Sequence, residues 1–152
     1  MNRTDAIHLI VKDNPDAIFV FSNGLTSRFA ADILGLNGPY LYLIHGMGES
    51  LSVGLGLASC LKKQIVVVDG DGNALMGLAS WSQLKLFDNI CYYILDNGKH
   101  ATTGGQKIPD FSFLDVKEVN RIKIDSEDSN LPPVPPKPDL IIQSFKGFLH
   151  AE

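Results

Sequence analysis

Four short apolar runs lie along the first two thirds of the chain, and each has the length and composition of a buried strand. They span residues 17–22, 40–44, 64–69 and 90–96. Strands that are apolar on both faces are typical of parallel sheets covered on both sides, because a half-exposed strand alternates apolar with polar residues. The pattern therefore predicts a parallel sheet between two layers of helices.

Longer amphipathic segments separate these runs, and their apolar residues recur every three or four positions, as in helices. They span residues 26–34, 48–61 and 73–87, and an opening helix over residues 4–13 ends before Pro15. Alternating strands and helices predict an α/β fold, doubly wound, with helices on both faces of a mostly parallel sheet. Close helix packing is expected at a set of small residues, Ser52, Gly54, Gly56, Ala58 and Ser59.

The last third of the chain has a weaker pattern. Residues 121–125 and 139–145 are predicted as two further strands, the first more polar and therefore at an edge of the sheet. Five of the eight prolines fall between Pro132 and Pro138, so the segment 127–138 is expected to be extended and exposed, with polyproline II character. A stiff connection to the last strand explains this composition, and a PxxP ligand for an SH3-type groove is the alternative.

Composition narrows the classes of partner. At 152 residues, with 45% hydrophobic and 20% charged residues, the chain is expected to fold as one domain over residues 1–152. A formal net charge of −4 without a cluster of Lys or Arg argues against binding to nucleic acid or to an anionic membrane. The N-terminal residues resemble neither a secretory signal nor a membrane span, so a cytoplasmic location is expected. Cys60 and Cys91 lack CxxC spacing and are expected to be buried free thiols.

Candidate chemistry lies at the carboxyl ends of two neighbouring predicted strands, where open parallel sheets bind their ligands. Asp71 stands between Gly70 and Gly72 after the third strand, so a carboxylate lies beside backbone amides that glycine leaves accessible. Asn97 follows the fourth strand and offers an amide oxygen. Because Mg²⁺ prefers oxygen ligands, the pattern favours a phosphorylated ligand bridged to Asp71 by magnesium, with an ordinary glycine turn as the alternative.

The sequence GDG, followed by 24 residues and then Asn97, resembles the diphosphate and Mg²⁺ signature of thiamine-diphosphate enzymes. The resemblance implies a thiamine-diphosphate-binding fold in which Asp71, the Asn97 side chain and the backbone carbonyl of Lys99 bind Mg²⁺. The family commonly has two asparagines where this chain has Asp96 and Asn97, and the second position is the ligand. The other residues that the resemblance places at the cofactor are Asn23, Gly24, Gly46, Met47, Gly70, Gly72, Asn73 and Ala74.

Several segments resemble the phosphonopyruvate and sulfopyruvate decarboxylase branch of this family, namely SNGLTSR, GMGES, DGDGNALM and NGKHATTGGQ. By this resemblance Met47 is the apolar wedge between the two rings of the cofactor, and the backbone carbonyl of His45 accepts a hydrogen bond from the aminopyrimidine. The His45 imidazole is either a polar group over the substrate or an incidental surface histidine. His100 and Gln106 are candidates for contacts near the substrate, with a structural role for His100 as the alternative. Residues 102–105 are expected to form a hinge or turn.

The resemblance also implies that part of the catalytic apparatus lies on another chain. Thiamine enzymes use a second, pyrimidine-binding domain that supplies an activating glutamate, and Glu49 does not correspond to it. We therefore expect a pyrimidine-binding partner subunit and a hetero-oligomer. The expected function is the diphosphate- and magnesium-binding subunit of a decarboxylase acting on a small 2-oxo acid. The alternatives are a subunit of a thiamine-diphosphate carboligase, acetolactate-synthase-like or transketolase-like, and a noncatalytic cofactor-binding module.

Overall fold

A five-stranded sheet forms the centre of the computed structural model, which describes residues 1–126 and 130–150. Its strand order is β2-β1-β3-β4-β7, and every neighbouring pair is parallel. The strands are β1 (Ile18–Phe21), β2 (Tyr40–Tyr42), β3 (Ile65–Gly70), β4 (Ile90–Asp96) and β7 (Val119–Lys123). Because all five run in the same direction, their carboxyl ends lie at one edge of the sheet.

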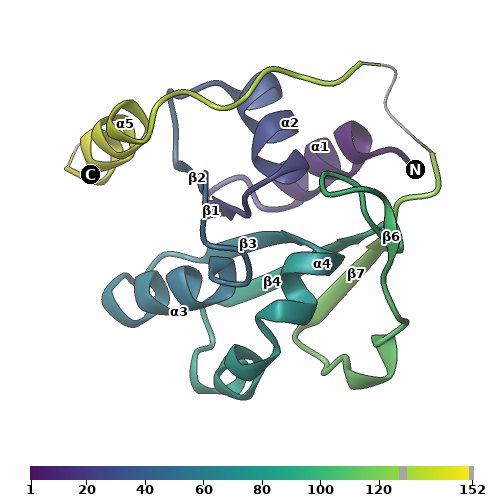
Figure 1. Ribbon diagram of the computed structural model, residues 1–152. Helices are drawn as coiled ribbons and strands as arrows, with labels where there is room; N and C mark the ends of the chain where they lie inside the picture. Colours follow the sequence, from purple (N-terminus) through teal and green to yellow (C-terminus); the bar gives the residue numbers. More distant parts are fainter. Residues whose placement is uncertain (127–129, 151–152) are drawn as a thin grey trace.

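Helices cover both faces of this sheet (Figure 1), so the predicted doubly wound α/β fold is confirmed. Helices α1 (Arg3–Asp13) and α2 (Leu25–Leu34) lie on one face, and α3 (Ser50–Cys60) lies on the other. The short helix α4 (Asp71–Met76) follows β3 directly, and α5 (Pro138–His150) packs beside the edge strand β2. No helix in the described part of the chain is long and apolar enough to cross a membrane.

The core follows from this two-sided covering. All four residues of β1 and the first five of β3 are buried, whereas the edge strand β7 is partly exposed, in agreement with its more polar sequence. Helix α3 comes close to β3 at Gly54, where a Cβ atom would lie 2.2 Å from Cγ2 of Val67. Of the small residues predicted to pack in α3, Gly54 and Ala58 are buried, and the other three are exposed.

The prediction of a strand over residues 139–145 is wrong, because these residues belong to helix α5. Ile141 and Phe145, four positions apart, are the buried residues of this helix, and that spacing places them on one helical face. Pro138 stands at the first helical position, where its missing N–H costs nothing. The short apolar run at the start of this segment fits a strand equally well, and the helical period becomes visible only over the longer stretch.

The helix predicted over residues 73–87 is interrupted. Helix α4 ends at Met76, and a 3-10 helix, η1 (Leu78–Leu86), follows Gly77. Gly77 packs against the loop before α3, since a Cβ atom there would lie 2.6 Å from the carbonyl oxygen of Gly48. The close approach of these two glycines explains why the chain changes direction here.

Between β4 and β7 the chain forms a hairpin that the apolar pattern did not predict. Its antiparallel strands are β5 (Lys99–His100) and β6 (Gln106–Lys107), and a short 3-10 helix, η2 (Ser112–Leu114), follows them. Residues 101–105 connect the two strands and include the segment 102–105, in which Gly104 and Gly105 are both at positive φ. These residues therefore form a turn, which was one of the two expectations for them.

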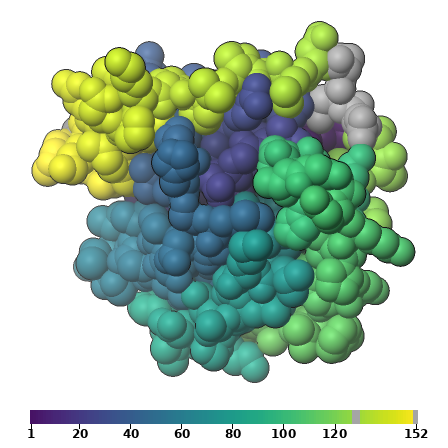
Figure 2. Space-filling model, viewed as in Figure 1, coloured from purple at the N-terminus to yellow at the C-terminus, as the bar shows by residue number. Residues whose placement is uncertain are grey.

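Residues 130–137 form a strap that crosses α2 on its way to α5 (Figures 1 and 2). The strap has no regular secondary structure, as expected. Nε of Arg28 donates to the carbonyl oxygens of Pro132, at 2.8 Å, and Pro133, at 3.3 Å, and Pro132 is buried. Most of the strap is exposed, as expected, and the buried Pro132 attaches it to the domain. Residues 127–129 of the predicted segment lie outside the described residues.

Both cysteines are free thiols, as predicted, but neither is fully buried. Cys60 is the last residue of α3 and is exposed, and Cys91 in β4 is half-buried. The sequence around Cys60 is apolar because it contributes residues to both the buried and the exposed side of helix α3. Cys60 lies on the exposed side, so apolar neighbours in the sequence do not bury it.

Candidate functional site

A small cavity of about 60 Å³ lies at the carboxyl edge of the sheet, where the segments after β1, β3 and β4 meet. Most residues predicted for the site line this cavity. They are Asn23, Gly24, Met47, Gly70, Asp71, Gly72, Asn73, Asn97, Lys99 and His100. Strands β3 and β4 pair in parallel, with Gly70 opposite Leu95. This pairing explains why Asp71 and Asn97, which are 26 positions apart in the sequence, reach the same cavity.

The three predicted metal ligands converge at this cavity. One side-chain amide atom of Asn97 lies 2.9 Å from the carbonyl oxygen of Lys99 and 3.3 Å from Oδ1 of Asp71. An amide nitrogen in this position donates a hydrogen bond to both oxygens. A cation bound there would instead face the amide oxygen, so the same three groups form an all-oxygen donor set.

Asp71 is buried at this site, with 4% of its surface exposed. Burial raises the pKa of Asp71 above its usual value, the backbone amides of Gly98 and Gly72 oppose this rise, and the neighbouring Asp96 adds to it. Gly98 N–H donates to Oδ2 at 2.7 Å, and Gly72 N–H donates to Oδ1 at 3.0 Å. A carboxylate that is both buried and close to a second carboxylate favours a bound cation.

The donor set fits a magnesium ion bound to phosphate. One carboxylate, one amide and one backbone carbonyl are hard oxygen ligands, and they leave positions that phosphate oxygens and water can complete. Oδ1 of Asn23, which also lines the cavity, is buried and has no hydrogen-bond partner in the described part of the chain. In residues 1–126 and 130–150, no cluster of three or more His, Cys, Asp or Glu forms a metal centre of another kind.

Asn73 connects three segments around the cavity. Its Oδ1 accepts a hydrogen bond from the amide of Gly48 at 2.9 Å, and its Nδ2 donates to the carbonyl of Asn23 at 3.4 Å. These bonds tie the loop before α3 and the loop after β1 to the start of α4. They also position Met47, whose side chain lines the cavity and remains 38% exposed.

Asp69 belongs to a buried polar cluster that no sequence motif marks. Asp69 Oδ2 accepts hydrogen bonds from Ser50 Oγ at 2.5 Å and from the Tyr92 hydroxyl at 2.9 Å. Burial raises the pKa of Asp69 to about 6, although these hydroxyl donors oppose the rise. The cluster joins the end of β3 to the first half of β4 and to the start of α3. A polar residue that ends an apolar run was the available signal for it, but its partners are distant in sequence.

The predicted histidines and Gln106 have different positions. His100 packs directly on Gly72, since a Cβ atom on Gly72 would lie 2.7 Å from Nδ1 of His100. His100 also forms part of the cavity wall. His45 and Gln106 are exposed and do not line the cavity. Gly46 is exposed in the loop before Met47, and Ala74 is fully buried in α4; neither lines the cavity.

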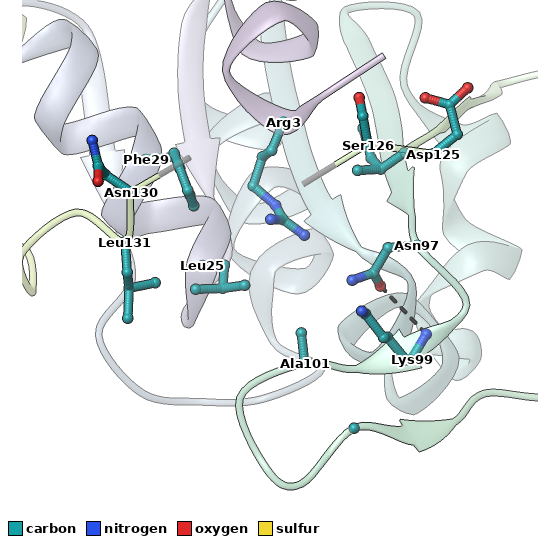
Figure 3. A pocket seen from close by; sticks show the side chains of 12 residues that line it. Arg3, Leu25, Phe29, Asn97, Lys99, Ala101, Asp125, Ser126, Asn130 and Leu131 are labelled. Atoms are coloured by element: carbon teal, nitrogen blue, oxygen red, sulfur yellow. Dashed lines mark hydrogen bonds between the residues drawn. The ribbon is translucent and has the colours of Figure 1, made fainter. Parts of the chain in front are cut away.

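Other residues line the site without having been predicted for it, namely Arg3, Leu25, Thr26, Ala101 and Thr102. Several of them also line a larger pocket of about 490 Å³ next to the small cavity (Figure 3). Arg3 belongs to the first turn of α1, and no motif around it in the sequence indicates a ligand. Its place at the site depends on how α1 packs beside α2.

Comparison with known proteins agrees with this geometry. Residues 22–136 match the family described as thiamine pyrophosphate enzyme, C-terminal TPP binding domain. Thiamine pyrophosphate is another name for thiamine diphosphate. The matched segment begins just after β1 and includes β2 through β7 and every predicted metal ligand.

Individual relatives align with about two thirds of the chain. A phosphonopyruvate decarboxylase of Streptomyces hygroscopicus is 40% identical over 101 residues, which are 65% of this chain and 25% of the relative. That of Streptomyces viridochromogenes is 36% identical over 108 residues, or 69% of this chain and 27% of the relative. The beta subunit of sulfopyruvate decarboxylase from Methanothermobacter thermautotrophicus is 33% identical over 108 residues, 70% of this chain and 58% of that subunit. The chain thus spans between a quarter and about three fifths of the length of these relatives. It belongs to the thiamine pyrophosphate enzymes, in which it corresponds to the C-terminal TPP-binding domain.

Proposed function

We propose that this chain is the diphosphate- and magnesium-binding subunit of a thiamine-diphosphate-dependent decarboxylase whose substrate is a 2-oxo acid similar to phosphonopyruvate or sulfopyruvate. The observation that carries the proposal is the convergence of Asp71, Asn97 and the Lys99 carbonyl at one cavity. The names of the relatives supply the substrate class. Residues 1–152 act as a single diphosphate-binding domain in this proposal.

The chain's own residues bind and orient the cofactor. Asp71, the Asn97 amide oxygen and the Lys99 carbonyl would hold Mg²⁺, which would help to bind the diphosphate. The backbone around Gly24, which has a φ of +87°, and around Gly70 would allow close approach of the phosphates. When bound, thiamine diphosphate supplies a nucleophilic carbon that adds to the keto carbon of the substrate and accepts the electrons released as carbon dioxide leaves.

Met47 and His100 both line the cavity, and the rings of the cofactor would extend past them. The partly exposed Met47 thioether, beside a polar cavity, offers an apolar surface on which an aromatic ring gains contact area. In this proposal Met47 would hold the bent conformation of the cofactor, and the carbonyl of His45 would accept a hydrogen bond from the amino group of the cofactor. His100 provides a polar wall near the substrate.

A second chain completes the active site in this proposal. The side chains of Met47 and Met76 are 38% and 59% exposed, and Gly48, the residue after Met47, packs closely on Met76. Relatives named as beta subunits support an arrangement in which a separate chain has the other half of the enzyme. The partner is a pyrimidine-binding subunit that supplies the activating glutamate, and the active protein is a hetero-oligomer.

Calorimetric titration with Mg²⁺ and thiamine diphosphate tests the cofactor assignment. The Asp71→Asn and Asn97→Ala variants should each weaken Mg²⁺-dependent binding about 100-fold, equivalent to about 2.7 kcal/mol, because the first removes the negative charge of a ligand and the second removes an oxygen ligand. The matched control is Asp88→Asn, an exposed aspartate that precedes β4 at the opposite end of the strand. Circular dichroism of each variant verifies folding. Wild-type affinity in both site variants would refute the metal assignment.

The reaction is tested with the chain and its pyrimidine-binding partner together. Carbon dioxide release from phosphonopyruvate or sulfopyruvate, faster than from pyruvate, with an aldehyde as the product, is the expected result. A ligated hydroxyketone as the main product would instead assign the chain to a carboligase. Absence of cofactor binding and of carbon dioxide release in the assembled pair would contradict the proposed function.

A further inference from the structure

Arg3 lies at the candidate site although it comes from the first turn of α1. It is buried, with 9% of its surface exposed, and its Cζ lies 5.6 Å from the centroid of the Phe29 ring. The side chain extends from α1 into the space between Leu25 and Asn97 (Figure 3). Phe29 therefore holds a cationic group in a fixed place at the wall of the cavity.

The position of Arg3 identifies which part of a bound cofactor it meets. Met47 and Asp71 line the small cavity but not the larger pocket, whereas Arg3, Asn97 and Lys99 line both. Arg3 is thus on the side of the small cavity that opens into the larger pocket, away from Met47. If the cofactor rings contact Met47, the terminal phosphate points toward Arg3.

The charge at this wall agrees with this placement. The two phosphates of such a cofactor carry about three negative charges at neutral pH, since a terminal phosphate alone carries close to two. Arg3 and Lys99 bring two positive side chains to the same wall. Asp125 also lines the larger pocket, but its side chain is 68% exposed and bonds to the amino group of Met1.

Building on the proposed function, we propose that Arg3, with the Lys99 ammonium beside it, binds the terminal phosphate of thiamine diphosphate. A guanidinium presents planar N–H donors that match two phosphate oxygens at once, and the buried position strengthens such bonds. Arg3 lies outside residues 22–136, the segment that matches the family. Helix α1 is therefore a functional part of the site as well as a cover for the sheet.

Titration of Mg²⁺ and thiamine diphosphate into the full chain tests this role. Arg3→Gln removes the charge but keeps most of the stem over Phe29, and it should weaken binding about 10- to 100-fold, as expected for loss of a charged hydrogen bond. Arg3→Lys keeps the charge and should lose less affinity than Arg3→Gln. The control is Lys12→Gln, an exposed cation on the same helix, with an affinity within about twofold of the wild type.

Phosphorus NMR of the bound cofactor identifies the contacted group. Between wild type and Arg3→Lys, the terminal phosphorus resonance should shift more than the inner one, a difference that a purely structural role would not produce. An affinity of Arg3→Gln within about threefold of wild type, or an equal or larger shift of the inner resonance, would overturn the inference and leave the proposed function intact. Equal weakening by Lys12→Gln would also overturn it. Absence of binding by the wild type would reject the proposed function and this inference together.

Discussion

The two aspartates of the sequence DGD have different surroundings, although only Gly70 separates them. Asp69 is turned into the core, where the hydroxyls of Ser50 and Tyr92 donate to it. Asp71 is turned to the cavity, where backbone amides donate to it. Hydroxyl donors join Asp69 to other elements, whereas Asp71 keeps its carboxylate directed at a ligand site. One acid thus has a structural role, and the other is available for a metal.

The two cysteines should differ in reactivity, because the thiolate is the reacting form and its access matters. Cys60 is exposed, whereas Cys91 is half-buried and burial raises the pKa of its thiol. At pH 8, labelling with a thiol reagent such as a dithiobenzoate should show one fast and one slow phase, with rates that differ at least about tenfold.

The Cys60→Ser variant identifies the phases of this labelling. It should lose the fast phase and keep the slow one. Loss of the slow phase instead, or a single rate in the wild type, would show that the exposure of the two thiols in solution differs from that described here.

Individual site residues were predictable when a local sequence motif marked them. Asp71 and Asn97 follow apolar strands at a characteristic spacing, so their meeting at one sheet edge follows from parallel pairing. Arg3 was not predictable, because its approach to the site depends on the packing of α1 on α2. The Asp69 cluster had the same difficulty, since Ser50 and Tyr92 meet it only in the folded protein.

At the scale of elements, helix α3 is positioned by the absence of a side chain. Gly54 faces β3, where a Cβ atom would lie 2.2 Å from Val67 Cγ2, while Gly56 on the same helix has no atom within 4 Å of its Cβ position. Two glycines in one helix therefore have opposite effects on its stability: the first permits close packing, and the second only lowers helix propensity.

Alanine at these two glycines makes a matched pair. Gly54→Ala should lower the free energy of unfolding by about 1–3 kcal/mol, because a methyl group overlaps Val67 and the helix must move. Gly56→Ala should raise it by about 0.5–1 kcal/mol through helix propensity. Urea unfolding followed by circular dichroism measures both. Equal effects of the two substitutions would contradict the packing of α3 described above.

The sequence pattern predicts elements well where the apolar residues form a clear run or repeat, and poorly where they are few or show no clear period. Helix α1, helix α2 and the buried strands agree with their predicted ranges to within a few residues. Segment 139–145 was assigned to a strand because its first apolar residues have no clear period, whereas Ile141 and Phe145 define a helical face. The β5–β6 hairpin has only two residues per strand, too few for any alternation to be visible.

At the scale of the whole molecule, the strap and α5 close one side of the sheet. Strand β2 is an edge strand, and α5 packs against it, with Ser144 Oγ donating to the Leu36 carbonyl at 2.6 Å. Arg28 attaches the strap to α2 through the Pro132 carbonyl. Covering an edge in this way protects its unpaired backbone groups from association with other chains.

Removal of the Arg28 contact should loosen the strap locally. Arg28→Ala deletes the side-chain hydrogen bonds to Pro132 and Pro133, each about 0.5–1.5 kcal/mol, so the strap should open more often. Limited proteolysis should cut residues 130–137 about tenfold faster in this variant. Lys146→Ala, an exposed residue of α5, is the control and should match the wild type. An unchanged cutting rate in Arg28→Ala would show that α5 alone holds the strap.

The small cavity has a consequence for folding, because the residues that line it extend from Arg3 to Thr102 and come from helices α1 and α2 and from segments at the carboxyl edge of the sheet. No fragment that lacks one of these elements assembles the whole cavity. A ligand that binds there stabilises the native chain but not the unfolded one, by about 2.7 kcal/mol at a concentration one hundred times its dissociation constant. Cofactor supply and the lifetime of the folded domain are thereby thermodynamically linked, so the abundance of this domain in a cell becomes a function of its ligand.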